Sequence, residues 1–199
     1  SSRNIQTDYD KNLQSVVQAI DQALIEAVAN NDIKDSEKDF FKYLLWTISH
    51  NESNWTNGVS LTENNGFAAG PFGLRYQPEG VSPESPLASL PTLDQALNPI
   101  DAARFALQQL LSWRNITPND PLMMLAQYGA GIYPDGDRYK NPWWGRVGLM
   151  EAHREMEVAI ALAQHFGSDI RSFFVPNLSF AERLPHSRLT GIRDNVSTN

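Results

Sequence analysis

The stretch FFKYLLWTISHNESNWTNGVSLTENNGFAAGPFGLRYQ, residues 40–77, joins an apolar helix to a polar loop that is rich in turn formers. Apolar residues recur in its first half at the spacing of one buried helix face, namely Phe40, Phe41, Leu44, Leu45 and Ile48. The helix then reaches polar residues around Glu52. We expect this acid to be half-buried, because it lies where a buried helix meets a loop. Partial burial would disfavour the carboxylate and raise its pKa toward the range that a general acid needs.

The periodicity of the whole chain predicts a mainly α protein with a small β-ribbon at most. Helices are predicted over residues 9–30, about 37–52, 93–97, 99–113, 122–127 and 146–166, and short strands over 59–62 and 72–74. Residues 78–91 hold four prolines, which predicts an irregular loop because proline interrupts helical hydrogen bonding. Residues 132–145 carry several aromatic residues without periodicity and predict a second loop.

Length and composition predict one globular domain with a core of its own. The chain has 199 residues, of which 41% are hydrophobic and 20% are charged, and these proportions are ordinary for a globular protein. We expect a single domain over residues 1–199, with a core of about 9–166 and a C-terminal extension of 167–199. The apolar positions expected to be buried in the last long helix are Val147, Met150, Met156, Ile160 and Leu162.

Charge and cysteine content exclude several classes of function. The formal net charge of −7 argues against a nucleic-acid-binding protein, because basic side chains supply most of that affinity. The absence of cysteine excludes disulfides, thiolate metal sites and cysteine nucleophiles. No apolar run approaches the roughly 18 residues that a membrane span needs, so none is expected in this chain, and no signal peptide is visible.

Two further motifs follow the Glu52-Ser53 pair in the sequence. The first is Gly70-Pro71-Phe72-Gly73-Leu74 with Gln77 nearby, and the second is Ala126-Gln127-Tyr128-Gly129-Ala130-Gly131. In this order the three motifs resemble those of the lysozyme-like lytic transglycosylases, a superfamily that includes the goose-type lysozymes. The resemblance covers about residues 38–165. It implies a lysozyme-like fold and cleavage of the glycan strands of peptidoglycan.

The resemblance also implies roles for individual residues. Glu52 corresponds to the catalytic acid and base of the family, and the expected substrate-binding residues are Ser53, Gly70, Phe72, Gly73, Gln77 and Tyr128. This chain departs from the family pattern at three places: Gln77 falls one residue late, the methionine usually found before it is missing, and Gly129 stands where the family has asparagine. Trp143 and Trp144 lie beside glycine and proline in a predicted loop, and their flat rings are of the kind on which sugars stack.

The number of carboxylates at the site decides the reaction. A glycosidase with a second, well-placed acid activates water and hydrolyses the bond. With a single acid, the N-acetyl group and the 6-hydroxyl of the sugar can close a 1,6-anhydro ring, as in the lytic transglycosylases. The candidates for a second acid are Glu63, Glu79, Glu84, Asp135 and Asp137. Glu63 lies where goose-type relatives carry extra carboxylates, although an exposed loop glutamate is the simpler explanation for it. We therefore expect a transglycosylase, with a Glu52–Glu63 muramidase as the alternative.

A non-catalytic role is a further alternative. The acidic charge, Gly129 and the shifted Gln77 suit a lysozyme-like module that binds glycan or forms part of a phage tail or secretion machine. No metal or organic cofactor is expected, because the histidines at 50, 153, 165 and 186 lack metal-ligand spacing. The expected partners are peptidoglycan strands and an envelope or virion assembly. The substrate implies the periplasm, the cell exterior or the virion as the location.

Overall fold

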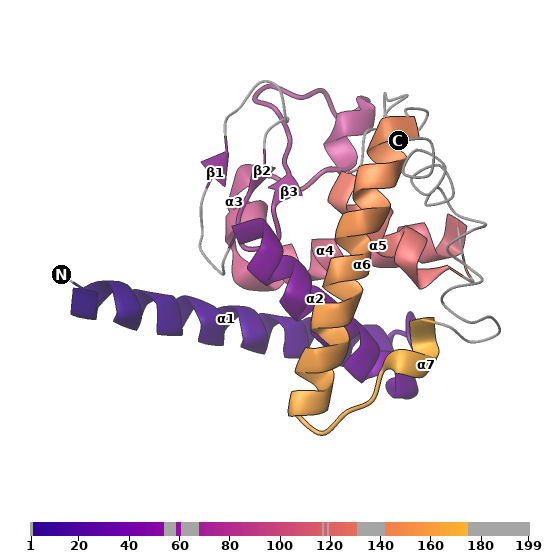
Figure 1. The fold of residues 1–199 in the computed structure, drawn as a ribbon. Coiled ribbons are helices and arrows are strands. Elements are labelled where there is room, and N and C mark those ends of the chain that lie inside the picture. The colour runs from indigo at the N-terminus through magenta and orange to yellow at the C-terminus, as the bar shows by residue number, and fades with distance from the viewer. Residues whose placement is uncertain are drawn as a thin grey trace, which may run out of the picture. The chain divides into compact units, whose positions relative to one another are not determined.

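The computed structural model describes residues 2–53, 59–60, 68–116, 118, 120–130 and 142–174. Among these, side chains are described for residues 12–53, 68–116, 118, 120–129 and 150–174. The fold is mainly helical with a small antiparallel sheet, which confirms the predicted mainly α class (Figure 1). The chain divides into two compact units, Ser1–Gln108 and Gln109–Asn199. No helix in the described part of the chain is long and apolar enough to cross a lipid bilayer.

The first unit contains most of the secondary structure. Its elements are α1 (Ser2–Ala29), the 3₁₀ turn η1 (Asp35–Glu37), α2 (Lys38–Ser53), β1 (Val59–Ser60), β2 (Ala68–Ala69), β3 (Leu74–Arg75), the 3₁₀ turn η2 (Pro86–Ser89), α3 (Leu93–Leu97) and the start of α4 (Pro99–Ile116). The boundary between the units falls within α4. The helix α1 begins at Ser2, seven residues before the predicted start. The early residues include no glycine or proline, so helix propagation through them costs little even without an apolar face.

Helices α1 and α2 pack on each other and form the core of the first unit. The buried face of α1 consists of Val16, Ala19, Ile20, Ala23, Leu24 and Ala27. Its counterpart in α2 includes all five apolar residues of the predicted stripe, from Phe40 to Ile48. Alanines at every fourth position of α1 leave room for a neighbouring helix to approach closely. The stripe read from the sequence of α2 is therefore a true core face.

The end of α1 is defined by a backbone motif. Asn31 has φ 60°, the amide of Asp32 donates to the carbonyl of Ala27 (2.9 Å), and the amide of Asn31 donates to that of Val28 (3.1 Å). This pattern is a Schellman motif, which satisfies carbonyls that the helix end leaves without partners. It confirms the helix end that the Asn30-Asn31-Asp32 sequence predicts.

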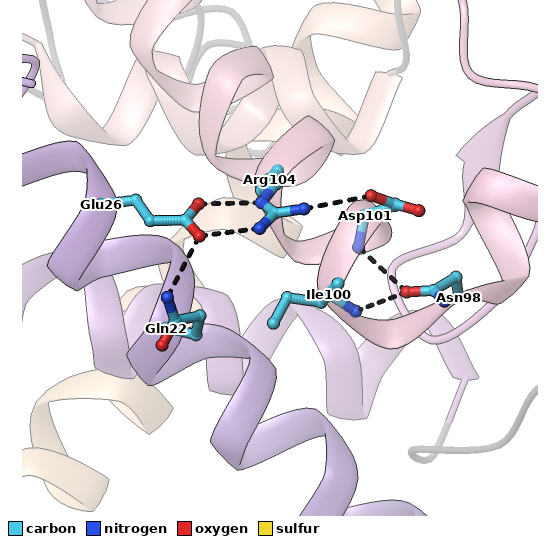
Figure 2. Close-up of polar contacts among 6 residues, drawn as sticks. All are labelled: Gln22, Glu26, Asn98, Ile100, Asp101 and Arg104. Carbon is cyan, nitrogen blue, oxygen red and sulfur yellow. Dashed lines mark hydrogen bonds and ion pairs between the residues drawn. The ribbon is translucent and has the colours of Figure 1, made fainter.

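Polar contacts join α1 to the first turns of α4 (Figure 2). Arg104 of α4 donates through Nε and Nη2 to the two carboxylate oxygens of Glu26, at 2.8 and 2.7 Å. It also contacts Asp101 at 3.2 Å. The side chain of Asn98 accepts hydrogen bonds from the amides of Ile100 and Asp101 and so caps α4, with Pro99 in the first helical position. The helix start predicted at Asn98-Pro99 is confirmed.

The described strands form an antiparallel sheet in the order β1-β2-β3. Val59 pairs with Ala69, and Ala69 pairs with Leu74. Residues 70–73 form the turn between β2 and β3, in which the amide of Gly73 donates to the carbonyl of Gly70 (3.2 Å). The predicted strand at 72–74 is thus wrong in its position. Gly70 and Gly73 have φ of 78° and 58°, which bend the chain where a strand was expected.

The proline-rich segment 78–91 is a loop, as predicted, except for the 3₁₀ turn η2. Ser85 caps this turn by accepting a hydrogen bond from the amide of Leu87 (3.2 Å), and Pro86 occupies its first position. After the loop, Thr92 and Gln95 exchange side-chain and backbone hydrogen bonds in a capping box that starts α3. The short helix predicted at 93–97 is confirmed.

The second unit contains α5 (Pro121–Ala130), α6 (Pro142–His165) and α7 (Arg171–Phe174), with α5 packed on both α6 and α7. The buried face of α6 is built from Ala152, Met156, Ala159 and Ala163. Met150 was predicted to be buried but is 44% exposed, whereas Met156 is buried as predicted. Predicted Val147 lies outside the described side chains.

Candidate functional site

The end of α2 lies against the turn between β2 and β3. The hydroxyl of Ser53 lies 2.9 Å from the carbonyl oxygen of Pro71 in that turn and 3.0 Å from the carbonyl oxygen of Ser49 in its own helix. The hydroxyl carries one proton, which it shares between these two acceptors. The resemblance implies that Ser53 binds substrate, and that contact stays a prediction. The structure places one contact within the helix and one across to the turn.

Glu52 reaches the same turn through Gly73. A Cβ atom placed on Gly73 would lie 2.5 Å from Oε2 of Glu52, 3.1 Å from its Cβ and 3.2 Å from its carboxyl carbon. Real side chains essentially never approach a Cβ as closely as 2.5 Å, so the carboxylate occupies space that any residue other than glycine would need. The Glu52-Ser53 pair and the glycine motif, some 20 residues apart in sequence, therefore meet at one place in the first unit.

The exposure of Glu52 corrects one expectation. We expected a half-buried acid, but the residue is exposed. The reason is its place in the last turn of α2, where the apolar face of the helix has already ended at Ile48 and Ser49. The residue is therefore accessible from solvent at the end of α2.

Two other predicted site residues have structural roles in the first unit. Phe72 is fully buried, so its ring packs in the interior and offers no face to a sugar, contrary to prediction. Gly70 is buried as well, and a Cβ placed on it would overlap the carbonyl oxygen of Ala96 in α3. Close approach to this backbone, rather than to a sugar, is what requires glycine at position 70.

Gln77 holds the proline-rich loop closed. Its side-chain amide donates to the carbonyls of Ala88 (2.8 Å) and Leu90 (2.7 Å), and its backbone amide donates to that of Pro91 (2.8 Å). Both side-chain donors are thereby used within the protein. The predicted contact of Gln77 with substrate stays a prediction, and it would have to use the carbonyl oxygen of the side chain.

The remaining predicted residues belong to the second unit or lie outside the described residues. Tyr128 is buried in α5, and Gly129 beside it is exposed. Trp143 and Trp144 lie in the first turn of α6 and not in a loop, because Pro142 starts the helix four residues earlier than predicted. Their side chains are outside the described part, and so is all of Glu63. Their sugar contacts stay predictions.

The sequence missed the residues that hold the site together. The carbonyl of Pro71 anchors Ser53, and the carbonyl of Ala96 packs against Gly70. Backbone carbonyls carry no sequence signal, since every residue has one. Glycine tolerates positive φ and leaves room for close backbone contacts, so Gly70 and Gly73 were the only local indication of these contacts in the sequence.

No group of three or more His, Asp or Glu side chains among the described residues is arranged to hold a metal ion. His153 and Glu157 lie one helical turn apart on α6, with Nδ1 3.5 Å from Oε1. Comparisons with protein-family models, with curated proteins and with solved structures find no significant match to this chain. A function for this protein can therefore be inferred only from the sequence motifs and from the positions of their residues in the structure.

Proposed function

We propose that this protein is a peptidoglycan lytic transglycosylase that cleaves the β-1,4 bond between N-acetylmuramic acid and N-acetylglucosamine, with Glu52 as its acid and base. The observation that carries the proposal is the meeting of Glu52-Ser53 with the Gly70–Gly73 turn. These segments are two of the three motifs on which the resemblance to the lysozyme-like transglycosylases depends. Their proximity is what a shared site requires.

The proposed chemistry uses one carboxyl group twice. Protonated Glu52 donates its proton to the glycosidic oxygen as the bond from that oxygen to C1 of the muramic acid breaks. The N-acetyl oxygen of the same sugar stabilises the positive charge that develops at C1. The Glu52 carboxylate then takes the proton of the 6-hydroxyl, whose oxygen bonds to C1 and closes the 1,6-anhydro ring. No water is consumed, and Glu52 ends protonated as it began.

Glu52 is exposed at the end of α2, so a glycan strand can reach it. A general acid near neutral pH must be held in its protonated form, which a dry environment favours. A glycan strand laid over the end of α2 would displace water from Glu52 and so favour that form.

A non-catalytic glycan-binding role is the second candidate. The exposure of Glu52 and the exposed Gly129, in place of the asparagine of the family, are the observations that favour it. A third possibility, a muramidase, needs a base such as Glu63 and yields a different product. All three share the glycan ligand, so product chemistry separates them.

The test is digestion of purified peptidoglycan with the wild type, Glu52→Gln and a control, Glu151→Gln. Glu151 is an exposed glutamate on α6 of the second unit, so its substitution makes the same chemical change at a position outside all three motifs. Mass spectrometry of the released muropeptides shows whether their sugar ends are 1,6-anhydro or reducing. We expect 1,6-anhydro ends from the wild type and Glu151→Gln, and none from Glu52→Gln.

Each other outcome counts against part of the proposal. Hydrated reducing ends would replace the transglycosylase with a muramidase and direct attention to Glu63→Gln. Anhydro products from Glu52→Gln would remove Glu52 from the mechanism. A wild type that releases nothing but sediments with peptidoglycan would establish the binding module instead.

A further inference from the structure

We propose that Gly73 is a positioning residue, whose missing side chain sets the place of the Glu52 carboxylate. The effect on catalysis rests on the proposed function, whereas the effect on the position of the carboxylate does not. Gly73 lies in the turn, 21 residues after Glu52, and is not itself a group that could transfer a proton. Gly73 would act only because the absence of a side chain at this position leaves room for the Glu52 carboxylate.

The distances show which part of Glu52 depends on that space. From a Cβ atom at position 73, Oε2 of Glu52 lies at 2.5 Å, whereas its Cβ and carboxyl carbon lie at 3.1 and 3.2 Å. The closest atom is thus the far end of a flexible side chain, and the rest of Glu52 is only tightly packed. An added methyl group would therefore push the carboxylate aside, whereas the contact with the Cβ of Glu52 at 3.1 Å requires a shift of only a few tenths of an ångström.

The second glycine of the turn behaves differently. A Cβ at Gly70 would meet the backbone carbonyl of Ala96, which cannot rotate away. Substitution at Gly70 should thus disturb the packing of α3 on β2, and so it is unsuited to a test of catalysis. Gly73→Ala is the variant that moves the acid and keeps the fold.

Gly80 supplies the matched control. Its φ of 69° is close to the 58° of Gly73, so alanine is strained at both positions for the same reason. A Cβ at Gly80, however, has no neighbour within 4 Å. Gly73→Ala and Gly80→Ala therefore share the cost of a left-handed backbone, and only the first adds a side chain against Glu52.

We expect Gly73→Ala to lower kcat on peptidoglycan glycan fragments about 100-fold and to leave KM nearly unchanged. A misplacement of the reacting group of about 1 Å is sufficient for a loss of this size. KM should change little, because the displaced carboxylate contributes to the chemical step rather than to binding. Gly80→Ala should retain the kcat and KM of the wild type, with a similar decrease in melting temperature to that of Gly73→Ala.

A second measurement is independent of activity. In the wild type, nuclear Overhauser contacts are expected between the side-chain protons of Glu52 and the Hα protons of Gly73. They should persist in Gly80→Ala and weaken in Gly73→Ala, while the contacts between α1 and α2 remain. Full kcat in Gly73→Ala, or unchanged Glu52 contacts, would overturn the positioning role. An inactive wild type would remove the proposed function, and the Overhauser contacts would still decide the position of the carboxylate.

Discussion

At the scale of single residues, this protein uses polar side chains to fasten loops that have little regular structure. Ser53 ties the end of α2 to the Pro71 carbonyl, and Gln77 ties together the two ends of the 78–91 loop. A hydrogen bond of this kind contributes about 1 kcal/mol, but a buried carbonyl left without its donor costs more. Substitution of Ser53 or Gln77 should therefore destabilise the loop that the residue holds.

Gln77→Ala should therefore loosen the loop rather than the whole unit. The substitution removes both donors from the Ala88 and Leu90 carbonyls and should cost about 1–3 kcal/mol of local stability. Hydrogen exchange followed by mass spectrometry should show faster exchange in peptides from 78–91 and unchanged exchange in α2. Gln108→Ala, at an exposed position of α4, is the control. Unchanged protection of the loop in Gln77→Ala would mean that the prolines alone hold it.

At the scale of elements, ion pairs fix the orientation of helices whose apolar faces already pack against each other. The pair of Glu26 and Arg104 links α1 to α4, and Lys42 of α2 lies 3.2 Å from Asp21 of α1. Hydrogen bonds from Arg104, and secondarily from Gln22, lower the pKa of Glu26 from 4.5 to about 2. Side chains in both pairs remain partly exposed, so solvent and salt screen them. Their role is to orient α1, with a small contribution to stability.

The lowered pKa of Glu26 predicts how stability depends on pH. A carboxyl group whose pKa is lower in the folded state stabilises the fold above its unfolded value, here 4.5, and this stabilisation is lost as the pH falls toward 2. Glu26→Gln should thus melt below the wild type at neutral pH, and the difference should shrink below about pH 4.5. Thermal melts over this range test the prediction. A constant difference at every pH would show that the ion pair is not its cause.

At the scale of the whole molecule, each compact unit relies on the burial of helix faces. In the first unit, Leu44 and Phe41 of α2 are fully buried, whereas Ile25 of α1 is 55% exposed. The second unit packs α5 against the alanine stripe of α6 and buries Phe174 of α7. Apolar packing, rather than the polar contacts, is therefore the main source of stability.

Substitutions at Leu44 and Ile25 test this difference. Leu44→Ala leaves a cavity between packed helices and should destabilise the protein by about 2–5 kcal/mol. Ile25→Ala removes an exposed side chain and should change stability by roughly 0.5 kcal/mol or less. Denaturant unfolding followed by circular dichroism measures both. Equal losses in the two variants would contradict the assignment of the core.

The sequence by itself determined the mainly α class, the course of most helices and the start of α4 at Asn98-Pro99. These features depend on interactions within a few residues, which leave periodic or capping signals in the chain. It also identified Glu52, Ser53 and Gly73 as belonging together, through their resemblance to one family of enzymes. It misplaced the start of α6, because the signal of Pro142 at a helix start was read as part of a loop.

Only the tertiary structure decided what those residues touch. The contact of Glu52 with Gly73, the bonds of Gln77 to Ala88 and Leu90, and the pairing of Glu26 with Arg104 join positions that are 11 to 78 residues apart. The exposure of Glu52 and the burial of Phe72 were likewise beyond the sequence pattern. The physical reason is that periodicity reports which face of an element is apolar. Which atom of a distant segment meets that face depends on how the elements pack.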